Sequence, residues 1–312
     1  MPHEANMTNK AASSDAPAHI LTVDVEDYFH VEAFAGTVSR TTWDEYSPRV
    51  VDNSRRLLDI FDRYEVKATF FVLGWVAERF PAIVREIHER GHELACHSYW
   101  HRKVDSLTPT QFRSDTREAC DAIENAASVR VSGYRAPTWS ITRRSLWAFD
   151  VLAEEGFEYD SSIYPIHHDL YGIPGANRYP YVQRCSDGQS LLEFPPATAK
   201  IAGMTFPAAG GGYLRIFPRA YTSWVFRQFE KAGKSLVLYL HPWEIDPEQP
   251  RLTGPLKSRF RHYTNLHRMQ ERLEFLLQRY RFVPFRSYLA DDCCPVRKND
   301  HANLAATQEA HG

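Results

Sequence analysis

The chain has 312 residues, enough for one large α/β domain, and 43% of them are hydrophobic, which suffices for a buried core. Its 37 basic and 39 acidic residues give a formal net charge of -2, so the sequence has no overall basic field to attract nucleic acid. It contains neither a signal-peptide core nor an apolar stretch long enough to span a bilayer. We therefore expect a cytoplasmic protein without a membrane span, whose oligomeric state the sequence leaves open.

Strands and helices alternate between two polar tails, residues 1–17 and 295–312, that we expect to be disordered. Mostly apolar runs predict strands at residues 19–23, 67–73, 92–98, 131–137, 157–162 and 234–241. Helical periodicity predicts helices at residues 50–64, 76–90, 109–126, 143–155 and 265–280, the third opened by a capping box at Thr108. This alternation is typical of an α/β fold with a parallel sheet, either open or closed into a barrel.

Polar clusters follow five of the predicted strands, at the positions where a parallel barrel carries its chemistry. They are Asp24-Val25-Glu26-Asp27, His97-Ser98-Tyr99-Trp100-His101, Arg135-Ala136-Pro137-Thr138, Asp160-Ser161-Ser162 and His241-Pro242-Trp243-Glu244. Each has an ordinary interpretation, such as Asp24 as a helix cap, Arg135 in a surface ion pair, or His241 as a structural histidine. Their joint occurrence after strands is what favours a single active site.

The spacing of His97 and His101 proves little by itself, because 14 histidines in 312 residues give about 0.6 such pairs by chance. His88 and His92 share this spacing across a predicted helix end, and we expect them at the surface. The position of His97 and His101 directly after a strand is what indicates metal binding.

The order of these motifs resembles the NodB-homology domain of carbohydrate esterase family 4, the polysaccharide deacetylases, over residues 18–290. GHELACHSYWH is similar to the second motif of that family, GYRAPTW to the third, and LVLYLH to the fifth, a strand ending in a catalytic histidine. The resemblance implies a distorted (β/α) barrel of about seven parallel strands, formed by a single domain. It also implies a metal-dependent hydrolase that removes N-acetyl groups from hexosamine units of a polysaccharide.

The C-terminal part of that domain, residues 191–290, resembles the subfamily that accompanies exosortase-type exopolysaccharide loci. The similar segments are FPAAGGGYLR, YLHPWEIDPEQPR and SRFRHYTN. This second resemblance implies an N-acetylated extracellular polysaccharide as the substrate, in preference to chitin or peptidoglycan.

The first motif departs from the family pattern, in which a T-F-D-D-G run supplies the general base and then a metal ligand. Here Asp24 lies at the base position, but Val25 lies at the ligand position, and valine cannot bind a metal. In an extended chain, residues two apart face the same side, which favours Glu26 as the ligand, with Asp27 as the alternate.

The resemblance assigns the metal site to this carboxylate together with His97 and His101. Two imidazoles and one carboxylate would hold a single divalent ion and leave open positions for substrate. Zinc is the default ion, and cobalt, nickel or iron fit the same donor set.

The resemblance also distributes the catalytic roles. Asp24 is the expected base, held in place by Arg135, and His241 is the expected acid, tuned by Asp160. The backbone N–H of Thr138 is expected to bind the oxyanion, although threonine replaces the aromatic residue of the third motif. The expected substrate-binding residues are Trp100, Trp139 and Trp243.

Two other functions stay open at this point. One is an allantoinase-like hydrolase of small amides on the same barrel, which the altered first motif keeps in consideration. The other is a non-catalytic glycan-binding relative, against which the presence of base, histidines, arginine and acid argues.

Overall fold

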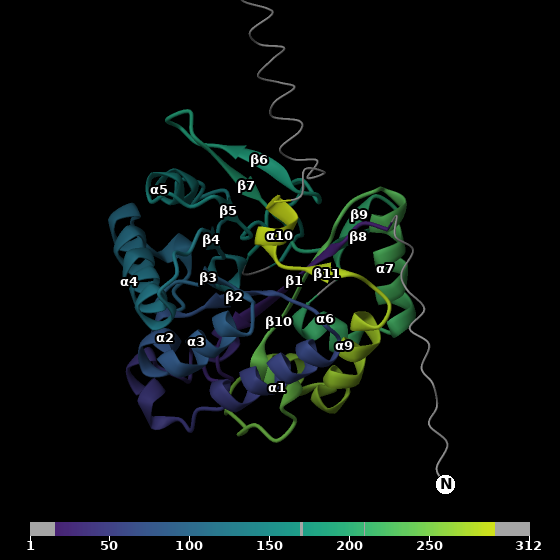
Figure 1. Cartoon of the computed structure of the whole chain (residues 1–312), viewed down its shortest axis with the longest axis horizontal. Helices are drawn as coiled ribbons and strands as arrows, with labels where there is room; N and C mark the ends of the chain where they lie inside the picture. The colour runs from purple at the N-terminus through teal and green to yellow at the C-terminus, as the bar shows by residue number, and fades with distance from the viewer. Residues whose placement is uncertain (1–15, 169–170, 209, 291–312) are drawn as a thin grey trace, which may run out of the picture.

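The computed structural model describes residues 16–168, 171–208 and 210–290, which form the α/β assembly drawn in Figure 1. Residues 1–15 and the predicted tail at 295–312 lie outside the described residues. No helix within the described ranges is long and apolar enough to cross a membrane.

Nine strands form one sheet at the centre of the described chain. They are β1 (His19–Val25), β2 (Thr69–Val72), β3 (Glu93–Cys96), β4 (Gly133–Tyr134), β5 (Tyr159–Asp160), β6 (Tyr181–Arg184), β7 (Ser190–Glu193), β10 (Val237–Leu240) and β11 (Phe282–Val283). The hydrogen-bonded order is β10-β1-β2-β3-β4-β5-β7-β6, with β11 also paired to β1. Neighbours from β10 to β7 run parallel, whereas β6 runs antiparallel to β7.

The sheet is a half-barrel. Its hydrogen-bonded path through the described residues ends at β10 on one side and at β6 on the other, so it does not close into a ring. The predicted α/β class with a mainly parallel sheet is confirmed. A separate hairpin of β8 (Thr198–Ile201) and β9 (Met204–Pro207) was not predicted from the sequence.

Helices flank the sheet and connect its strands (Figure 1). They are α1 (Val50–Arg63), α2 (Gly74–Arg79), α3 (Pro81–Glu89), α4 (Pro109–Ala127), α5 (Ala148–Glu154), α6 (Gly211–Ile216), α7 (Arg219–Lys231), α8 (Leu256–Tyr263), α9 (Met269–Leu277) and α10 (Phe285–Ala290). The capping box predicted at Thr108 is confirmed, because its side chain accepts the N–H of Gln111 and the Gln111 side chain bonds back.

Three predicted helices differ in extent from the structure. The helix predicted at residues 265–280 is shortened to α9, which follows a 3-10 turn at Leu266–Arg268. The helix predicted at residues 76–90 is divided into α2 and α3, because Pro81 disfavours the helical conformation of Phe80, which has φ -131° and ψ 54°. The helix predicted at residues 143–155 is reduced to α5, since the chain before it forms turns in which the Ser145 hydroxyl accepts the Thr142 N–H. The surface position expected for His92 is wrong as well: His92 is fully buried, and its Nδ1 accepts the N–H of Ala68.

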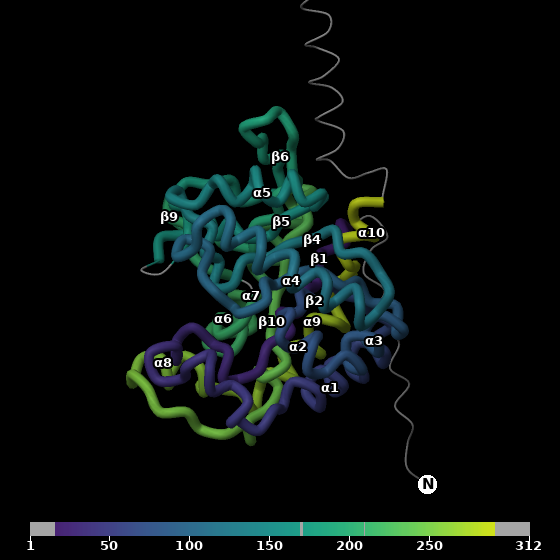
Figure 2. The backbone as a smooth tube through the Cα atoms, turned by 90° about the vertical axis from the view of Figure 1, so that its left-hand side faces the viewer, coloured from purple at the N-terminus to yellow at the C-terminus, as the bar shows by residue number. Residues whose placement is uncertain are grey.

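Strand β1 pairs with β10, β2 and β11, and every residue in it is buried. Parallel neighbours end at the same edge, so the segments that follow β1, β3, β4 and β10 meet there. The loop after β1 also lies beside the chain around α8 (Figure 2). The Thr37 hydroxyl donates to the Thr253 carbonyl at 2.9 Å, and the rings of Phe34 and His262 lie 5.1 Å apart. These two segments border the pocket described next.

Candidate functional site

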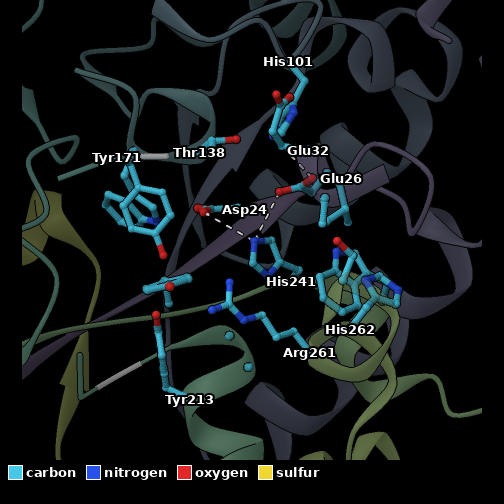
Figure 3. A pocket seen from close by; sticks show the side chains of 18 of the residues that line it. Asp24, Glu26, Glu32, His101, Thr138, Tyr171, Tyr213, His241, Arg261 and His262 are labelled. Atoms are coloured by element: carbon cyan, nitrogen blue, oxygen red, sulfur yellow. Dashed lines mark ion pairs between the residues drawn. The ribbon is translucent and has the colours of Figure 1, made fainter. Parts of the chain in front are cut away.

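The residues at the carboxyl ends of the parallel strands line one pocket of about 260 Å³ (Figure 3). From the predicted set, the pocket contains Asp24, Glu26, His97, His101, Thr138, Trp139, His241 and Trp243. Segments from both halves of the chain therefore converge at one edge of the sheet.

Three of these side chains could hold a metal ion. One ligand atom each from Glu26, His97 and His101 lies within 4.8 Å of the others. Glu26 Oε2 is 3.5 Å from His101 Nε2, and Glu26 Oε1 is 4.0 Å from His97 Nε2. The Nδ1 of His97 donates to the Arg135 carbonyl at 2.7 Å, which leaves the Nε2 lone pair directed at this cluster.

The charge states of the cluster suit a divalent cation. Burial lowers the pKa of His97 to about 4, so its imidazole is neutral at physiological pH and can act as a ligand. Burial alone would raise the pKa of Glu26, but His101 and His241 outweigh it and hold that pKa well below its usual range. Glu26 Oε2 is buried and has no hydrogen-bond partner among the described residues. An ionised carboxylate with an unsatisfied oxygen beside two imidazoles is a donor set that fits zinc and similar ions.

Arg135 is fully buried beneath Asp24 and is not a surface residue. Its Nη1 donates to Asp24 Oδ1 at 2.6 Å and to the Thr22 hydroxyl at 2.8 Å. Its Nη2 and Nε bond the hydroxyl and carbonyl of Ser161, and its guanidinium lies 4.1 Å above the Phe71 ring. These contacts fix one oxygen of the Asp24 carboxylate and leave the other facing the pocket.

His241 lies across the pocket from His97 and His101. Its Nε2 is 3.2 Å from Glu26 Oε1 and 3.9 Å from Asp24 Oδ2. Burial alone would lower the pKa of His241, but Glu26 and Glu244 outweigh it and raise that pKa to about 10. These two carboxylates therefore favour the protonated form of the imidazole.

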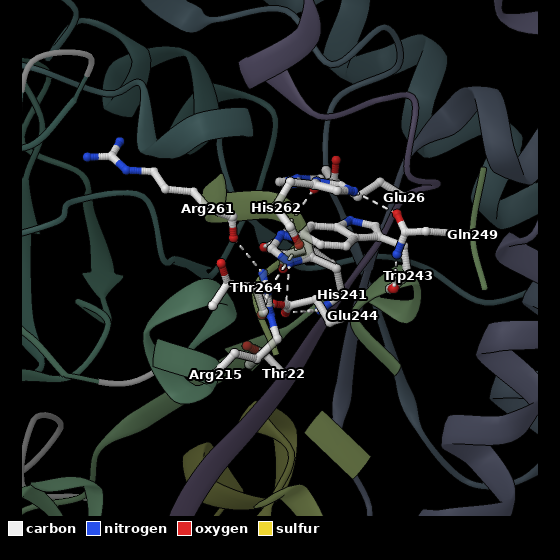
Figure 4. Close-up of polar contacts among 12 residues, drawn as sticks. Thr22, Glu26, Arg215, His241, Trp243, Glu244, Gln249, Arg261, His262 and Thr264 are labelled. Carbon is white, nitrogen blue, oxygen red and sulfur yellow. Dashed lines mark hydrogen bonds and ion pairs between the residues drawn. The ribbon is translucent and has the colours of Figure 1, made fainter. Parts of the chain in front are cut away.

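Glu244 is the residue that orients His241. Its Oε2 lies 3.1 Å from His241 Nδ1 and accepts the His241 backbone N–H, while its Oε1 accepts from Arg215 Nε at 2.9 Å (Figure 4). The Trp243 ring lies between the His241 and His262 rings, with centroid distances of 5.1 Å and 4.1 Å. A predicted motif supplied the histidine, but its carboxylate partner was not predicted. The sequence did carry a signal for Glu244. It lies three residues after His241, which is the spacing of a capping box, and Pro242 occupies the first position of the turn.

The two remaining predicted carboxylates lie elsewhere. Asp27 accepts the N–H groups of Arg49 and Val50 at the start of α1, so it caps this helix and lies outside the candidate metal cluster of Glu26, His97 and His101. Asp160 accepts from Ser162 and lies opposite Glu193 in the register of β5 and β7. Among the contacts of the described residues, none joins Asp160 to His241. No contact therefore supports the expected tuning of His241 by Asp160. The carboxylate in contact with His241 Nδ1 is Glu244.

Of the three tryptophans predicted to bind substrate, two lie in the pocket and one does not. Trp139 and Trp243 line the pocket, whereas Trp100 packs on Trp43 at 6.1 Å and is absent from the lining. Thr138 and Trp139 both have left-handed backbone, with φ of 56° and 52°, and this turn brings Thr138 to the pocket wall. The other wall contains Tyr171, Tyr213, Tyr239, Arg261 and His262, none of which was predicted.

Comparisons with known proteins show which families the chain matches. Residues 35–157 match the family described as polysaccharide deacetylase, and residues 161–290 match one described as a domain of unknown function (DUF3473). A peptidoglycan deacetylase of Helicobacter pylori is 28% identical over 139 residues, which is 45% of this chain and 43% of that protein. The chain thus spans less than half of that relative's length.

Solved structures show the same fold. A crystal structure described as a putative polysaccharide deacetylase from Mycobacterium smegmatis has a TM-score of 0.59 and 22% identity, covering 93% of each chain. The crystal structure of an allantoinase has a TM-score of 0.56 and 17% identity, covering 87% of this chain and 88% of that one. Residues 35–157 thus match the polysaccharide deacetylase family, and the described chain has the fold of solved structures related to it.

Proposed function

We propose that the protein is a metal-dependent hydrolase that removes N-acetyl groups from hexosamine residues of a bacterial exopolysaccharide. One observation carries the proposal: Glu26, His97 and His101 form a buried ligand set in the pocket that also contains Asp24 and His241. Amide hydrolysis needs a base for water, stabilisation of the oxyanion and a proton for the amine. The pocket contains a candidate for each task.

Glu26, His97 and His101 would hold the ion, with zinc as the default and cobalt, nickel or iron as alternatives. A divalent ion there would supply Lewis-acid polarisation of the acetyl carbonyl. The neutral imidazole of His97 and the ionised Glu26 are the forms that bind such an ion. Asp27 is the weaker ligand candidate because both of its oxygens already accept backbone N–H groups.

Asp24 would accept the proton of the attacking water through Oδ2, while Arg135 keeps Oδ1 fixed at 2.6 Å. The Thr138 N–H would donate to the carbonyl oxygen as negative charge develops there. His241 would then give its Nε2 proton to the departing amine nitrogen, with its ring held by Glu244. Trp139 and Trp243 supply flat apolar surface for a sugar ring.

The C-terminal stretch supports the assignment to an exopolysaccharide. Its resemblance to the exosortase-associated subfamily includes the segments around Gly211, His241 and Arg261, and all three residues line the pocket. Because β7, β10 and β11 of this stretch share a sheet with β1 to β5, we treat residues 18–290 as one domain.

The decisive experiment measures acetate released from an N-acetylated oligosaccharide by zinc-loaded protein. We expect release that stops with a chelator, returns with zinc and is absent in Asp24→Asn. A parallel reaction with allantoin tests the small-amide alternative. Consumption of allantoin without acetate release from any N-acetylated glycan would refute the proposal, and glycan binding without either reaction would identify a binding protein.

A further inference from the structure

The pocket wall around α8 carries a local excess of positive charge. Residues 249–270 contain five basic residues and no acidic residue, in a chain whose formal net charge is -2. The basic residues are Arg251, Lys257, Arg259, Arg261 and Arg268. Ser258, Arg261 and His262 of this segment line the pocket. Of the five basic residues, Arg261 alone lines the pocket, so this segment places one cation in the wall of the proposed active site.

The buried side chain of Arg215 fixes the backbone around Arg261. The buried Arg215 guanidinium donates to the carbonyls of Arg261, His262 and Thr264, at distances of 3.2, 2.9 and 2.6 Å (Figure 4). Arg261 is thus an arginine on an anchored stretch of chain, and its guanidinium extends into the pocket toward Tyr171 and Tyr213 (Figure 3).

The other charges of the pocket have partners. Asp24 pairs with Arg135, and Arg215 pairs with Glu244. Glu26 lies between the imidazoles of the metal-binding cluster, and Glu32 lies 4.0 Å from Arg40. Arg261, by contrast, forms no ion pair with any carboxylate of the described residues. A planar guanidinium with free donors is suited to bidentate binding of a carboxylate.

We propose that the natural substrate is an acidic glycan, in which the N-acetylated hexosamine is flanked by, or bears, a carboxylate that Arg261 binds. This inference rests on the proposed function and adds the charge class of its substrate. Arg259 offers a matched control, because it is exposed on the same helix but is not part of the pocket lining.

The test measures the affinity of zinc-loaded protein for three oligosaccharides by titration calorimetry. They are a neutral tetramer of N-acetylglucosamine, a hyaluronan tetrasaccharide with a glucuronate beside each N-acetylglucosamine, and a glycan tetrasaccharide bearing lactyl carboxylates on N-acetylmuramate. We expect at least one acidic tetrasaccharide to bind more tightly than the neutral one. The tighter of the two identifies the carboxylate as a uronate or as a lactyl ether.

Arg261→Gln should weaken binding of the preferred acidic tetrasaccharide by about 10-fold or more, the cost of losing a charged hydrogen bond. It should change the affinity for the neutral tetramer by no more than about 2-fold. Arg259→Gln should change neither affinity by more than that. Raising the salt concentration should weaken the binding of the acidic ligand only. Affinity is measured rather than turnover, so the result is independent of whether acetate is released.

Equal affinity of the wild type for neutral and acidic tetrasaccharides would overturn the inference, even if acetate release supported the proposed function. An equal loss for both ligands in Arg261→Gln would also overturn it, because Arg261 would then only support the wall. Leu256 and Phe260 are exposed on the same helix, with 81% and 65% of their surface accessible. Binding of phosphatidylserine vesicles without any preference among the tetrasaccharides would assign this basic segment to a lipid surface instead.

Discussion

Glu244 Oε2 and His241 Nδ1 lie 3.1 Å apart, and the other oxygen of Glu244 is held at 2.9 Å by the buried Arg215. A carboxylate on Nδ1 fixes both the orientation of the imidazole and the nitrogen that faces the substrate. Because Nδ1 is engaged by Glu244, Nε2 is the atom presented to the pocket. In the mechanism proposed above, proton delivery to the leaving amine would therefore depend on Glu244 as well as on His241.

Glu244→Gln should lower kcat on an N-acetylated oligosaccharide by about 10–100-fold, because the imidazolium loses its charged partner. An activated acetate ester, whose leaving group needs little protonation, should be affected much less. Asp246→Asn is the matched control, since Asp246 is a buried carboxylate on the same turn that pairs with Arg49 at 2.8 Å. If both variants lose amide and ester turnover in the same proportion, Glu244 only stabilises the turn.

His241→Ala should reduce amide turnover by about 10²–10⁴-fold, the usual contribution of a general acid. The variant should keep its metal and much of its affinity for the oligosaccharide, because the carboxylate and imidazoles of the ligand set are unchanged. The measurement compares amide and activated-ester rates on the folded variant. A parallel fall in the two rates would remove His241 from the mechanism.

The two carboxylates of the first motif should separate in their effects. Asp24→Asn should abolish turnover and keep the metal, whereas Glu26→Gln should weaken metal affinity, because only Glu26 lies in the ligand cluster. Metal titration with parallel activity assays distinguishes them. Loss of metal in Asp27→Asn alone would contradict this assignment and indicate the alternate ligand.

His97→Ala should lose its divalent ion after purification and dialysis, as measured by elemental analysis. His88→Ala is the control, because His88 has a histidine at the same spacing but lies outside the ligand cluster. Equal metal content in both variants would show that the buried histidines serve only the fold.

His92 predicts a pH dependence of stability away from the pocket. Burial lowers its pKa to about 4, below the unfolded value of about 6.5, so the unfolded state binds the proton more readily. The free energy of unfolding should therefore fall as pH drops from about 6.5 to about 4, by about 3 kcal/mol from this residue. His92→Asn keeps an acceptor for the Ala68 N–H. It should reduce the dependence of the free energy of unfolding on pH over that range, as measured by urea denaturation. An unchanged slope would contradict the prediction.

The sequence predicted what depends on local pattern. Apolar runs located the parallel strands, and a shared strand edge brought Asp24, His97 and His241 together as expected. Pro81 is a local signal for the division of the second predicted helix, because proline disfavours a helical conformation in the residue before it. Short-range patterns of this kind are readable because backbone geometry fixes them within a few residues.

Other features depend on contacts between distant segments. Arg215 and Glu244 are 29 positions apart, and Trp139 lines the pocket whereas Trp100 does not, although both follow strands of the sheet. Asp160 was assigned to His241 by resemblance alone, whereas the register of β5 with β7 pairs it with Glu193. No periodicity in the sequence carries such information, because tertiary packing decides it.

Arg215 has a consequence for how such proteins can be recombined. One side chain joins α6, the turn after β10 and the carbonyls at residues 261–264. A chimera that exchanged the C-terminal stretch piecemeal would leave a buried cation without its acceptors. Grafts between relatives should therefore move residues 211–264 as one block, and His241 and the pocket wall around Arg261 would be inherited together.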